Sequence, residues 1–259
     1  MSDPSESKPV QAWDEIASFW DEAITPLGNN YFHRLQAPCL DRFLSKHLHS
    51  DARCLDLATG NGLIARWMLD KGAGWVLATD ASSKMVDIAE RHFVSGGYDG
   101  KKLFDVIVIN MALMDIERLD VLAAALPRLL SPGGVFVATV LHPVFFTSNA
   151  AKSISISFDP VTGEQVTTRS KVITEYLNVA PAKGIACPNQ PVKQMYYHRP
   201  IHELLSIFLK GGKLVMDAIE EPAFTDDDFD DKRVESSTNF TQLPAILAFR
   251  MKHRLDKFE

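Results

Sequence analysis

The chain has 259 residues, of which 46% are hydrophobic and 23% are charged, a balance typical of a globular domain that buries a substantial core. Acidic residues outnumber basic residues by 33 to 27, and the net charge of −6 argues against a nucleic-acid partner, because phosphate backbones bind basic surfaces. Its three cysteines are scattered and no apolar run approaches the roughly 20 residues of a membrane span, so we expect a cytoplasmic protein without a disulfide framework, metal site or membrane segment.

The N-terminal part of the chain divides into a polar tail and a helical segment. Residues 1–12 contain several Ser and Pro residues and are expected to form a disordered tail. From Trp13 to Trp20 apolar residues recur at helical spacing, and a second helical stretch follows the break at residues 26–30. Residues 13–50 are therefore predicted to be helical, ahead of the first strand.

Apolar runs and helical stretches alternate through the middle of the chain. The sequence predicts strands over 53–58, 75–79, 104–110 and 135–141, and helices over 63–71, 83–92 and 118–130. A helix over 200–209 and strands over 214–219 and 245–251 complete the pattern. Apolar strands that alternate with helices predict a doubly wound, mostly parallel sheet covered on both faces. We expect one α/β domain over residues 13–259.

Residues 142–200 interrupt this alternation. Pro and Gly are placed irregularly there, and the aromatic residues follow no strict period. Long irregular segments in compact domains usually carry function. We interpret residues 142–200 as an insertion that caps a ligand site.

The turn after the first predicted strand, CLDLATGNGLIA at residues 54–65, has the pattern G-x-G-x-x-A from Gly60 to Ala65. Asp80 lies twenty residues after Gly60, at the end of the second predicted strand. Such a turn lets a ligand approach the backbone, and a carboxylate at this spacing suits the ribose hydroxyls of a nucleoside. The turn alone leaves open a nicotinamide dinucleotide site, or a tight turn with no ligand.

Four ordered segments resemble the motifs of class I methyltransferases, which use S-adenosylmethionine. They are DLATGNG at residues 56–62, DASSKM at 80–85, FDVIVIN at 104–110 and LSPGG at 130–134. The resemblance spans roughly residues 13 to 251. Three further segments, GNNYFHR at 28–34, MALMDI at 111–116 and YHRP at 197–200, are similar to the small-molecule methyltransferases of the quinone-biosynthesis-like group (methyltransferase type 11).

The resemblance implies a Rossmann-like methyltransferase fold, with residues 13–50 as a helical lid and residues 142–200 as an acceptor cap after the family's fifth strand. It also implies S-adenosylmethionine as the cofactor, with Asp80 accepting hydrogen bonds from the ribose hydroxyls. For Met85 core packing is the alternative, and for Asp80 a helix cap. The implied cofactor residues are Asp56, Ala58, Thr59, Gly60, Asn61, Gly62, Asp80, Ala81, Ser82, Met85, Asn110, Met111 and Tyr31.

The chain departs from the family at its third, edge strand. Residues 93–103 are too few for a strand, a crossover and a return, so we expect that strand to be missing. The adenine pocket would then be more open, with Asp99 as a weak substitute for the acid that the third strand carries. The missing strand therefore favours, as the alternative to a methyltransferase, a non-methylating member of the same fold. An NAD(P)-dependent oxidoreductase, which the glycine turn alone leaves open, is the third reading.

The expected reaction is methyl transfer to a small-molecule acceptor, with oxygen or nitrogen favoured over carbon. His142 directly follows the predicted strand 135–141 and is a candidate general base or acceptor-positioning residue. A structural histidine that turns the chain before Pro143 is the alternative. A homodimer is expected only as the commonest assembly. The substrate-side candidates are His33, Phe145, Tyr197, His198 and Arg199.

Overall fold

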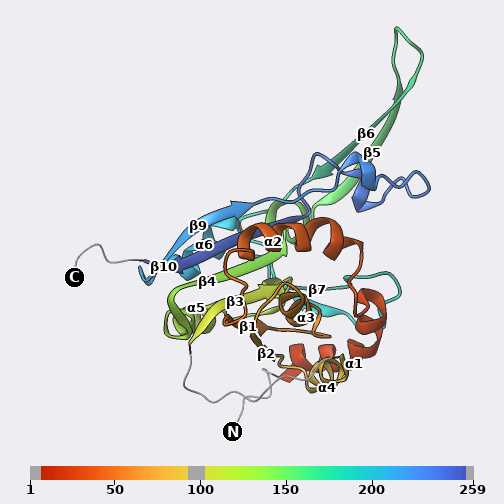
Figure 1. The fold of residues 1–259 in the computed structure, drawn as a ribbon. Helices are drawn as coiled ribbons and strands as arrows, with labels where there is room; N and C mark the ends of the chain where they lie inside the picture. The colour runs from red at the N-terminus through yellow and green to blue at the C-terminus, as the bar shows by residue number, and fades with distance from the viewer. Residues whose placement is uncertain (1–6, 93–102, 255–259) are drawn as a thin grey trace.

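A six-stranded sheet runs through the part of the molecule that the computed structural model describes, residues 7–92 and 103–254 (Figure 1). Its strand order is β2-β1-β3-β4-β10-β9. The strands are β1 (Arg53–Leu57), β2 (Trp75–Thr79), β3 (Phe104–Asn110), β4 (Leu130–Leu141), β9 (Leu214–Glu220) and β10 (Ile246–His253). Neighbouring strands from β2 to β4 run parallel, and β10 is antiparallel to both β4 and β9. The predicted doubly wound, mostly parallel sheet is confirmed.

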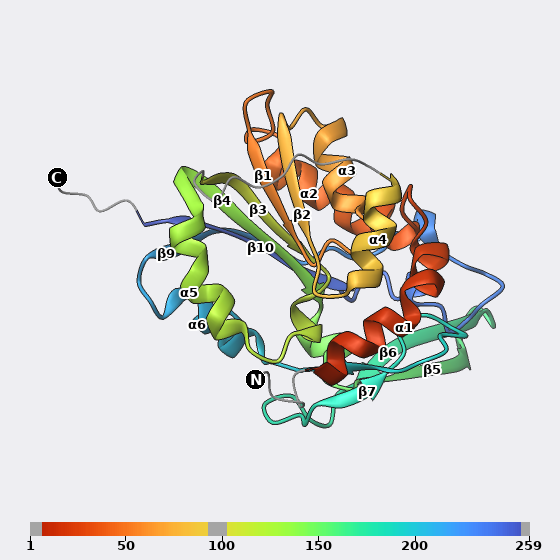
Figure 2. The ribbon, with the colours of Figure 1, turned by 90° about the horizontal axis from the view of Figure 1, so that it is seen from below.

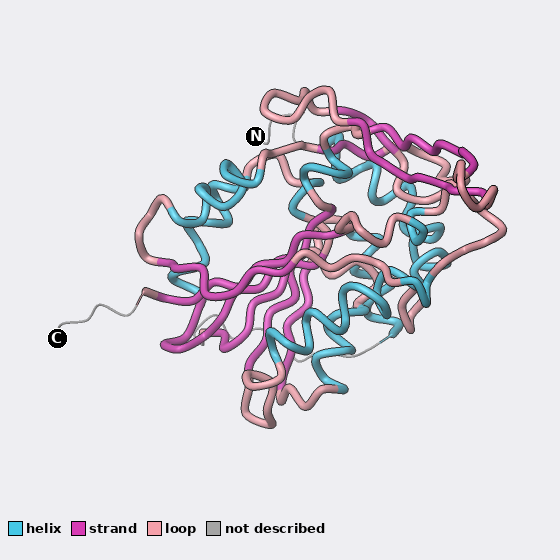
Figure 3. Tube along the Cα trace, turned by 90° about the horizontal axis from the view of Figure 1, so that it is seen from above, coloured by secondary structure: helices cyan, strands magenta, loops and turns pink. Residues whose placement is uncertain are grey.

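Helices cover both faces of this sheet, as the tube in Figure 3 shows. They are α1 (Ser7–Ile24), α2 (Ala37–Leu44), α3 (Leu63–Asp70), α4 (Ser83–His92), α5 (Leu119–Leu129) and α6 (Ile201–Leu209). Along β3, Val106 and Val108 belong to the core that α2 and α3 cover, whereas Ile107 and Ile109 belong to the core under α5 and α6. Successive side chains of a strand point to opposite faces, so an apolar run such as β3 must be covered twice.

The first helix lies beside α4 (Figure 2). It begins at Ser7, so residues 7–12 belong to the helix and not to the disordered tail expected from the sequence, while residues 1–6 lie outside the described residues. Ala17 packs against Met85 and Ile88 of α4. Trp13 and Trp20 pack on the same cluster as a T-shaped pair, with ring centroids 5.3 Å apart and an interplanar angle of 87°. This apolar contact holds α1 against α4.

The predicted second helical stretch contains a π-helical turn, η1 (Phe32–Gln36), that runs directly into α2. Gly28 precedes it with a positive φ of 91°, and a Cβ there would lie 2.3 Å from the Phe32 ring. Glycine is therefore required where the chain turns from α1 into η1. π-Helical turns are frequent at functional sites.

Two β-hairpins lie between β4 and α6, where the sequence predicts irregular chain. One pairs β5 (Ala151–Phe158) with β6 (Gln165–Val172), and the other pairs β7 (Ala182–Gly184) with β8 (Gln194–Tyr196). The β5–β6 hairpin extends away from the central sheet (Figure 1). Its strands are largely exposed, so they lack the apolar runs by which the central strands are recognised.

The turn predicted at residues 131–134 is part of β4, which begins at Leu130. The pairing with β3 shifts register here, because Phe104 pairs with Leu130 while Val106 pairs with Val135. Gly133 has a φ of 84° within this irregularity. The predicted turn is thus a bulge at the start of the strand.

The prediction of a missing third strand concerns residues 93–103, of which 93–102, including Asp99, lie outside the described residues. In the described sheet, β2 is an edge strand. No helix within residues 7–92 and 103–254 is long and apolar enough to cross a membrane. The same residues contain no group of three His, Cys, Asp or Glu side chains placed to hold a metal ion.

Candidate active site

The carboxyl ends of β1, β2 and β3 bring the predicted motifs to one edge of the sheet. The turn after β1 bonds to β2, since the Thr59 N–H donates to the Thr79 carbonyl at 2.9 Å. Ala58 and Met111, which follow β1 and β3, both have positive φ angles, of 53° and 56°. Left-handed backbone at non-glycine residues is uncommon and clusters at functional sites. Both strand ends therefore carry a strained residue at this edge.

The glycine turn leaves open space above its backbone. Gly60 has a φ of 57°, and a Cβ built there would have no atom within 4 Å. Gly62, with a φ of 81°, caps the start of α3, where the Leu63 N–H donates to the Asn61 side chain at 3.2 Å. The turn needs glycine for its conformation, and the space beside Gly60 is available to a ligand.

Asp80 is fixed beside this space. One carboxylate oxygen accepts from the Gly60 N–H at 2.9 Å and the other from the Ser82 N–H at 2.9 Å. Burial raises the pKa of Asp80, and these backbone bonds oppose the rise. A carboxylate oxygen has two lone pairs, so both oxygens keep acceptor capacity for ligand hydroxyls.

Asp56 and Thr59 lie inside the protein beneath the turn. Asp56 is 1% exposed, and its carboxylate accepts from the Thr59 hydroxyl at 2.5 Å. Burial raises the pKa of Asp56 to about 7, while the Thr59 bond lowers it. The structure therefore gives both side chains a supporting position under the turn.

Asn61 faces the first helix and not the open space. Its amide donates to the Asp21 carboxylate at 3.0 Å and to the Thr25 carbonyl at 3.2 Å. The same Asp21 oxygen lies 3.3 Å from the His92 ring nitrogen Nε2 at the end of α4. Asp21 thus joins α1 to the glycine turn and to α4, a role that sequence reasoning missed.

A second aspartate of α1 bonds to the start of α4. The Ser82 hydroxyl donates to Asp14 at 2.6 Å, and the Lys84 N–H donates to the same oxygen at 3.3 Å. Ser82 and Met85, both predicted to line the cofactor, are each 1% exposed beneath α1, whereas Ala81 is exposed. Met85 has the core packing that the sequence left as its alternative.

The end of β3 is tied to the N-terminal segment by a partly buried network of hydrogen bonds. Asn110 donates to the Gln36 side chain at 2.9 Å and accepts from the Thr139 hydroxyl at 2.7 Å. The Met111 N–H donates to that hydroxyl at 3.1 Å. Because Gln36 sits in η1, this network fixes the π-helical turn against the strand ends.

Tyr31 lies next to the same strand ends. It stacks edge-on against Phe224 at 5.1 Å, in an apolar cluster that Met111 and Phe146 also contact. Burial raises the pKa of Tyr31, and a hydrogen bond with the Ser237 side chain opposes the rise. Tyr31 therefore connects the predicted cofactor residue Met111 to the C-terminal loop.

His142 is 1% exposed and both its ring nitrogens have partners. The Val144 N–H donates to Nδ1 at 3.3 Å, and Nε2 lies 2.7 Å from Glu221. An acceptor Nδ1 places the proton of a neutral ring on Nε2, from where it donates to the carboxylate. Burial lowers the pKa of His142 and the Glu221 bond raises it. Phe145 packs on the ring, with centroids 4.9 Å apart.

The other substrate-side candidates separate into two places. His33 is exposed and contacts the Phe32 ring. His198 lies between the Thr147 hydroxyl at 2.8 Å and the Tyr176 carbonyl at 2.6 Å. Tyr197 and Arg199 line a small pocket beyond the end of β4, together with Leu113, Met114, Val140, Pro143, Thr147 and Leu204.

The Arg199 guanidinium is engaged by the segment η2 (Leu113–Asp115) and the residues after it. It donates to the carbonyls of Leu113 at 3.3 Å, Ile116 at 2.8 Å and Glu117 at 2.5 Å. In η2 itself, Asp115 Oδ1 is buried and has no hydrogen-bond partner among the described residues. Burial raises the pKa of Asp115 well above its ordinary range. Sequence reasoning missed Asp115, although the segment MALMDI that contains it resembles the small-molecule methyltransferases.

Comparison with known proteins places these features in a family. A family model described as a methyltransferase domain matches residues 29–180, which is more than half of the chain. An S-adenosylmethionine dependent methyltransferase from Mesorhizobium loti is 24% identical, with 84% of this chain and 96% of that chain covered and a TM-score of 0.63. No curated protein sequence matches the chain.

Two further solved structures share the fold. A putative S-adenosylmethionine dependent methyltransferase from Listeria monocytogenes is 20% identical, covering 85% of this chain and all of that one, with a TM-score of 0.59. The DhpI–SAH complex is 16% identical, covers 95% of each chain and has a TM-score of 0.54. The Rossmann-like methyltransferase fold predicted from the sequence is confirmed.

Proposed function

The chain belongs to the methyltransferase domain family, and from that membership we propose that it transfers the methyl group of S-adenosylmethionine to a small-molecule acceptor. The observation that carries the proposal is the Asp80 carboxylate, held by the Gly60 N–H at 2.9 Å beside open space. The name of the Mesorhizobium relative and the SAH complex of DhpI support the same cofactor.

The residues of the site fit this cofactor. The Asp80 oxygens keep acceptor capacity that suits the two ribose hydroxyls, and the turn at Gly60 admits a ligand close to the backbone. Asn110 and Met111 would lie near the sulfonium end, at the strained end of β3. When bound, S-adenosylmethionine supplies a methyl carbon activated by positive sulfur.

The N-terminal helices would act as the lid of the site, and the segment 142–200 as the acceptor cap. Asp14 and Asp21 hold α1 against the two cofactor motifs, which would exclude water and keep both motifs oriented. Ser82, Asn61 and Met85 would then support the cofactor site through the lid.

His142 remains our candidate on the acceptor side, and its geometry favours the positioning role. Both ring nitrogens are occupied, by Val144 and Glu221, so proton abstraction would first require one of these bonds to break. Transfer to oxygen or nitrogen is favoured over carbon, since the protein then has only to align the acceptor and remove a dissociable proton.

The experiment is isothermal titration of the protein with S-adenosylmethionine and S-adenosylhomocysteine, with NAD as a control. We expect micromolar binding of both sulfur nucleosides and none of NAD. Asp80→Ala should weaken binding at least tenfold, about 1.4 kcal/mol, whereas Asp87→Ala, at an exposed position of α4, should not. If neither sulfur nucleoside binds, the methyltransferase proposal falls. Binding without turnover on any acceptor would favour the non-methylating alternative.

A further inference from the structure

Lys171 of β6 holds its ammonium group between aromatic rings at the base of the β5–β6 hairpin. The side chain is half-buried, with Nζ 4.2 Å from the centroid of the Phe146 ring and 5.9 Å from that of Phe240. It donates to the Phe145 carbonyl at 2.9 Å. The contacts of the Lys171 ammonium are therefore one neutral carbonyl and two ring faces, none of which carries a negative charge.

No carboxylate within the described residues forms an ion pair with Lys171. Its charged neighbour is another lysine, Lys152, which faces it across the hairpin register and donates to the Glu235 carbonyl at 2.6 Å. Burial and, to a smaller extent, the charge on Lys152 together lower the pKa of Lys171 to about 8. A partly desolvated cation without a counterion is costly, and acids outnumber bases in this chain.

The other charged groups near this place are already engaged. Arg169, two residues before Lys171 on β6, lies over the Phe229 ring at 5.0 Å. The Glu235 carboxylate pairs with Arg233 at 3.5 Å. The charge on Lys171 is thus left for a group that comes from outside the chain.

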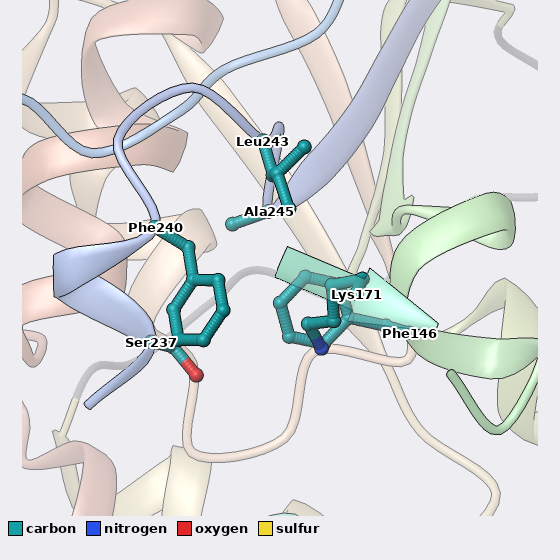
Figure 4. Close-up of a pocket in the computed structure, with 6 residues that line it drawn as sticks. All are labelled: Phe146, Lys171, Ser237, Phe240, Leu243 and Ala245. Carbon is teal, nitrogen blue, oxygen red and sulfur yellow. The ribbon is translucent and has the colours of Figure 1, made fainter. Parts of the chain in front are cut away.

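A narrow pocket lies beside the Lys171 ammonium, lined by Phe146, Lys171, Ser237, Phe240, Leu243 and Ala245. Figure 4 shows the Phe240 ring facing Phe146 and Lys171, with Leu243 and Ala245 at one end and the Ser237 hydroxyl toward the other. A cation, a hydroxyl and apolar walls are the elements of a site for a small organic anion.

The pocket adjoins the candidate active site. Ser237 is close enough to Tyr31 to lower the pKa of its phenol, and Phe146 belongs to the apolar cluster that Tyr31 and Met111 share. The Ala245 carbonyl accepts from the His142 N–H at 3.0 Å. An acceptor bound near Met111 and His142 could therefore reach Lys171 with a second group.

We propose that Lys171 and Ser237 bind an anionic group, a carboxylate or a phosphate, on the acceptor, so that this site selects small anionic acceptors. Lys152 adds positive charge from the facing strand. That the bound anion belongs to a methyl acceptor rests on the proposed methyltransferase function, whereas anion binding at Lys171 is tested without turnover.

The test measures acylation of lysines by acetic anhydride at pH 8, quantified by mass spectrometry in chloride, in inorganic phosphate and in benzoate. We expect phosphate or benzoate to slow labelling of Lys171 at least threefold, and the arm that does so identifies the anion class. Lys183, an exposed lysine of β7, should label equally in all three. If neither anion slows Lys171, or if Lys183 slows equally, the proposal is overturned.

Turnover then connects the pocket to the acceptor. Lys171→Met keeps the apolar stem against Phe146 and should leave S-adenosylhomocysteine binding within twofold of the parent, while Lys183→Met serves as the matched control. The turnover test uses two acceptors that differ only in an acidic group. We expect Lys171→Met to raise the KM of the acidic acceptor at least tenfold relative to the parent, and Lys183→Met to leave it unchanged. Equal losses on both members would contradict the assignment. If the parent protein itself does not bind S-adenosylhomocysteine, that result would instead contradict the methyltransferase proposal.

Discussion

The carboxylate of Asp21 accepts a hydrogen bond from the Asn61 amide at 3.0 Å, across forty residues of sequence. The same oxygen lies 3.3 Å from the His92 ring. One side chain of α1 therefore holds the glycine turn and the end of α4 together. The position of the first helix and the shape of the turn are coupled through this carboxylate.

Replacing Asp21 by Ala should loosen both attachments. We expect the free energy of unfolding to fall by about 1–2 kcal/mol, because the Asn61 amide loses a partly buried acceptor. Thermal denaturation measures the first effect, and titration with S-adenosylhomocysteine should show weaker binding. The neighbouring Glu22 is exposed, and Glu22→Ala should change neither quantity. If Asp21→Ala binds S-adenosylhomocysteine as tightly as the parent, the position of α1 does not affect the glycine turn.

Gly60→Ala distinguishes the ligand site from ordinary glycine strain. Alanine at a φ of 57° costs about 1–2 kcal/mol in stability, and its methyl group would enter the open space beside the turn. Gly133 has a φ of 84° and equally open surroundings, so Gly133→Ala should cost similar stability. Only Gly60→Ala should weaken S-adenosylhomocysteine binding tenfold or more. Equal affinities for the two variants would place the ligand elsewhere.

Asp56 should make the stability of the protein depend on pH. Its pKa of about 7 in the folded state lies above the ordinary 3.8, so the folded state holds the Asp56 proton more tightly than the unfolded state does. The stabilisation that results from this difference is fully present below pH 3.8. As pH rises toward 7 the unfolded state releases its proton first, and the free energy of unfolding falls by about 4 kcal/mol in all. Above pH 7 the loss is complete.

Urea denaturation of the parent and Asp56→Asn from pH 4 to pH 8 measures this dependence. As pH rises to 7, the free energy of unfolding of the parent should fall relative to that of Asp56→Asn, and above pH 7 the difference should stay constant. Asp51→Asn, at an exposed position, should show the same pH dependence as the parent. Parallel curves for the parent and Asp56→Asn would show that Asp56 is ionised throughout.

Arg199 was predicted to bind substrate, yet its guanidinium donates to three backbone carbonyls of η2 and the residues after it. Arg199→Met should therefore lower the free energy of unfolding by about 2 kcal/mol, because the carbonyls of Leu113 and Ile116, whose bonds are partly buried, lose a charged donor. The exposed Arg128→Met should be neutral in the same chemical denaturation. Full stability with lost acceptor binding would instead favour the substrate role.

Local signals in the sequence predicted the central sheet closely. The bounds of β2, α4 and β3 agree with the predicted ranges 75–79, 83–92 and 104–110, because apolar runs and helix starts depend on neighbouring residues. The β5–β6 hairpin was not predicted, since its exposed strands have Ser, Thr and Lys in place of an apolar run. Its alternation of Ile with Ser at residues 153–157 was the available signal.

The glycine turn and Asp80 were predicted because their spacing is a local pattern. The contacts that surround them join residues far apart, such as Asp14 and Ser82 at a separation of 68. No short-range pattern marks such a pair before the fold is known. The same holds for His142, whose partner Glu221 lies 79 residues away, and for the unpaired Lys171, whose surroundings come from three segments.

The T-shaped pair of Trp13 and Trp20 supplies two of the four tryptophans of the chain, both on α1. Their rings rest on the cluster that contains Met85 and Ile88 of α4. Indole emission depends on the polarity and quenching groups around the ring, so separation of α1 from α4 would alter it directly. The protein carries an intrinsic fluorophore pair that reports, without any label, whether its first helix is seated.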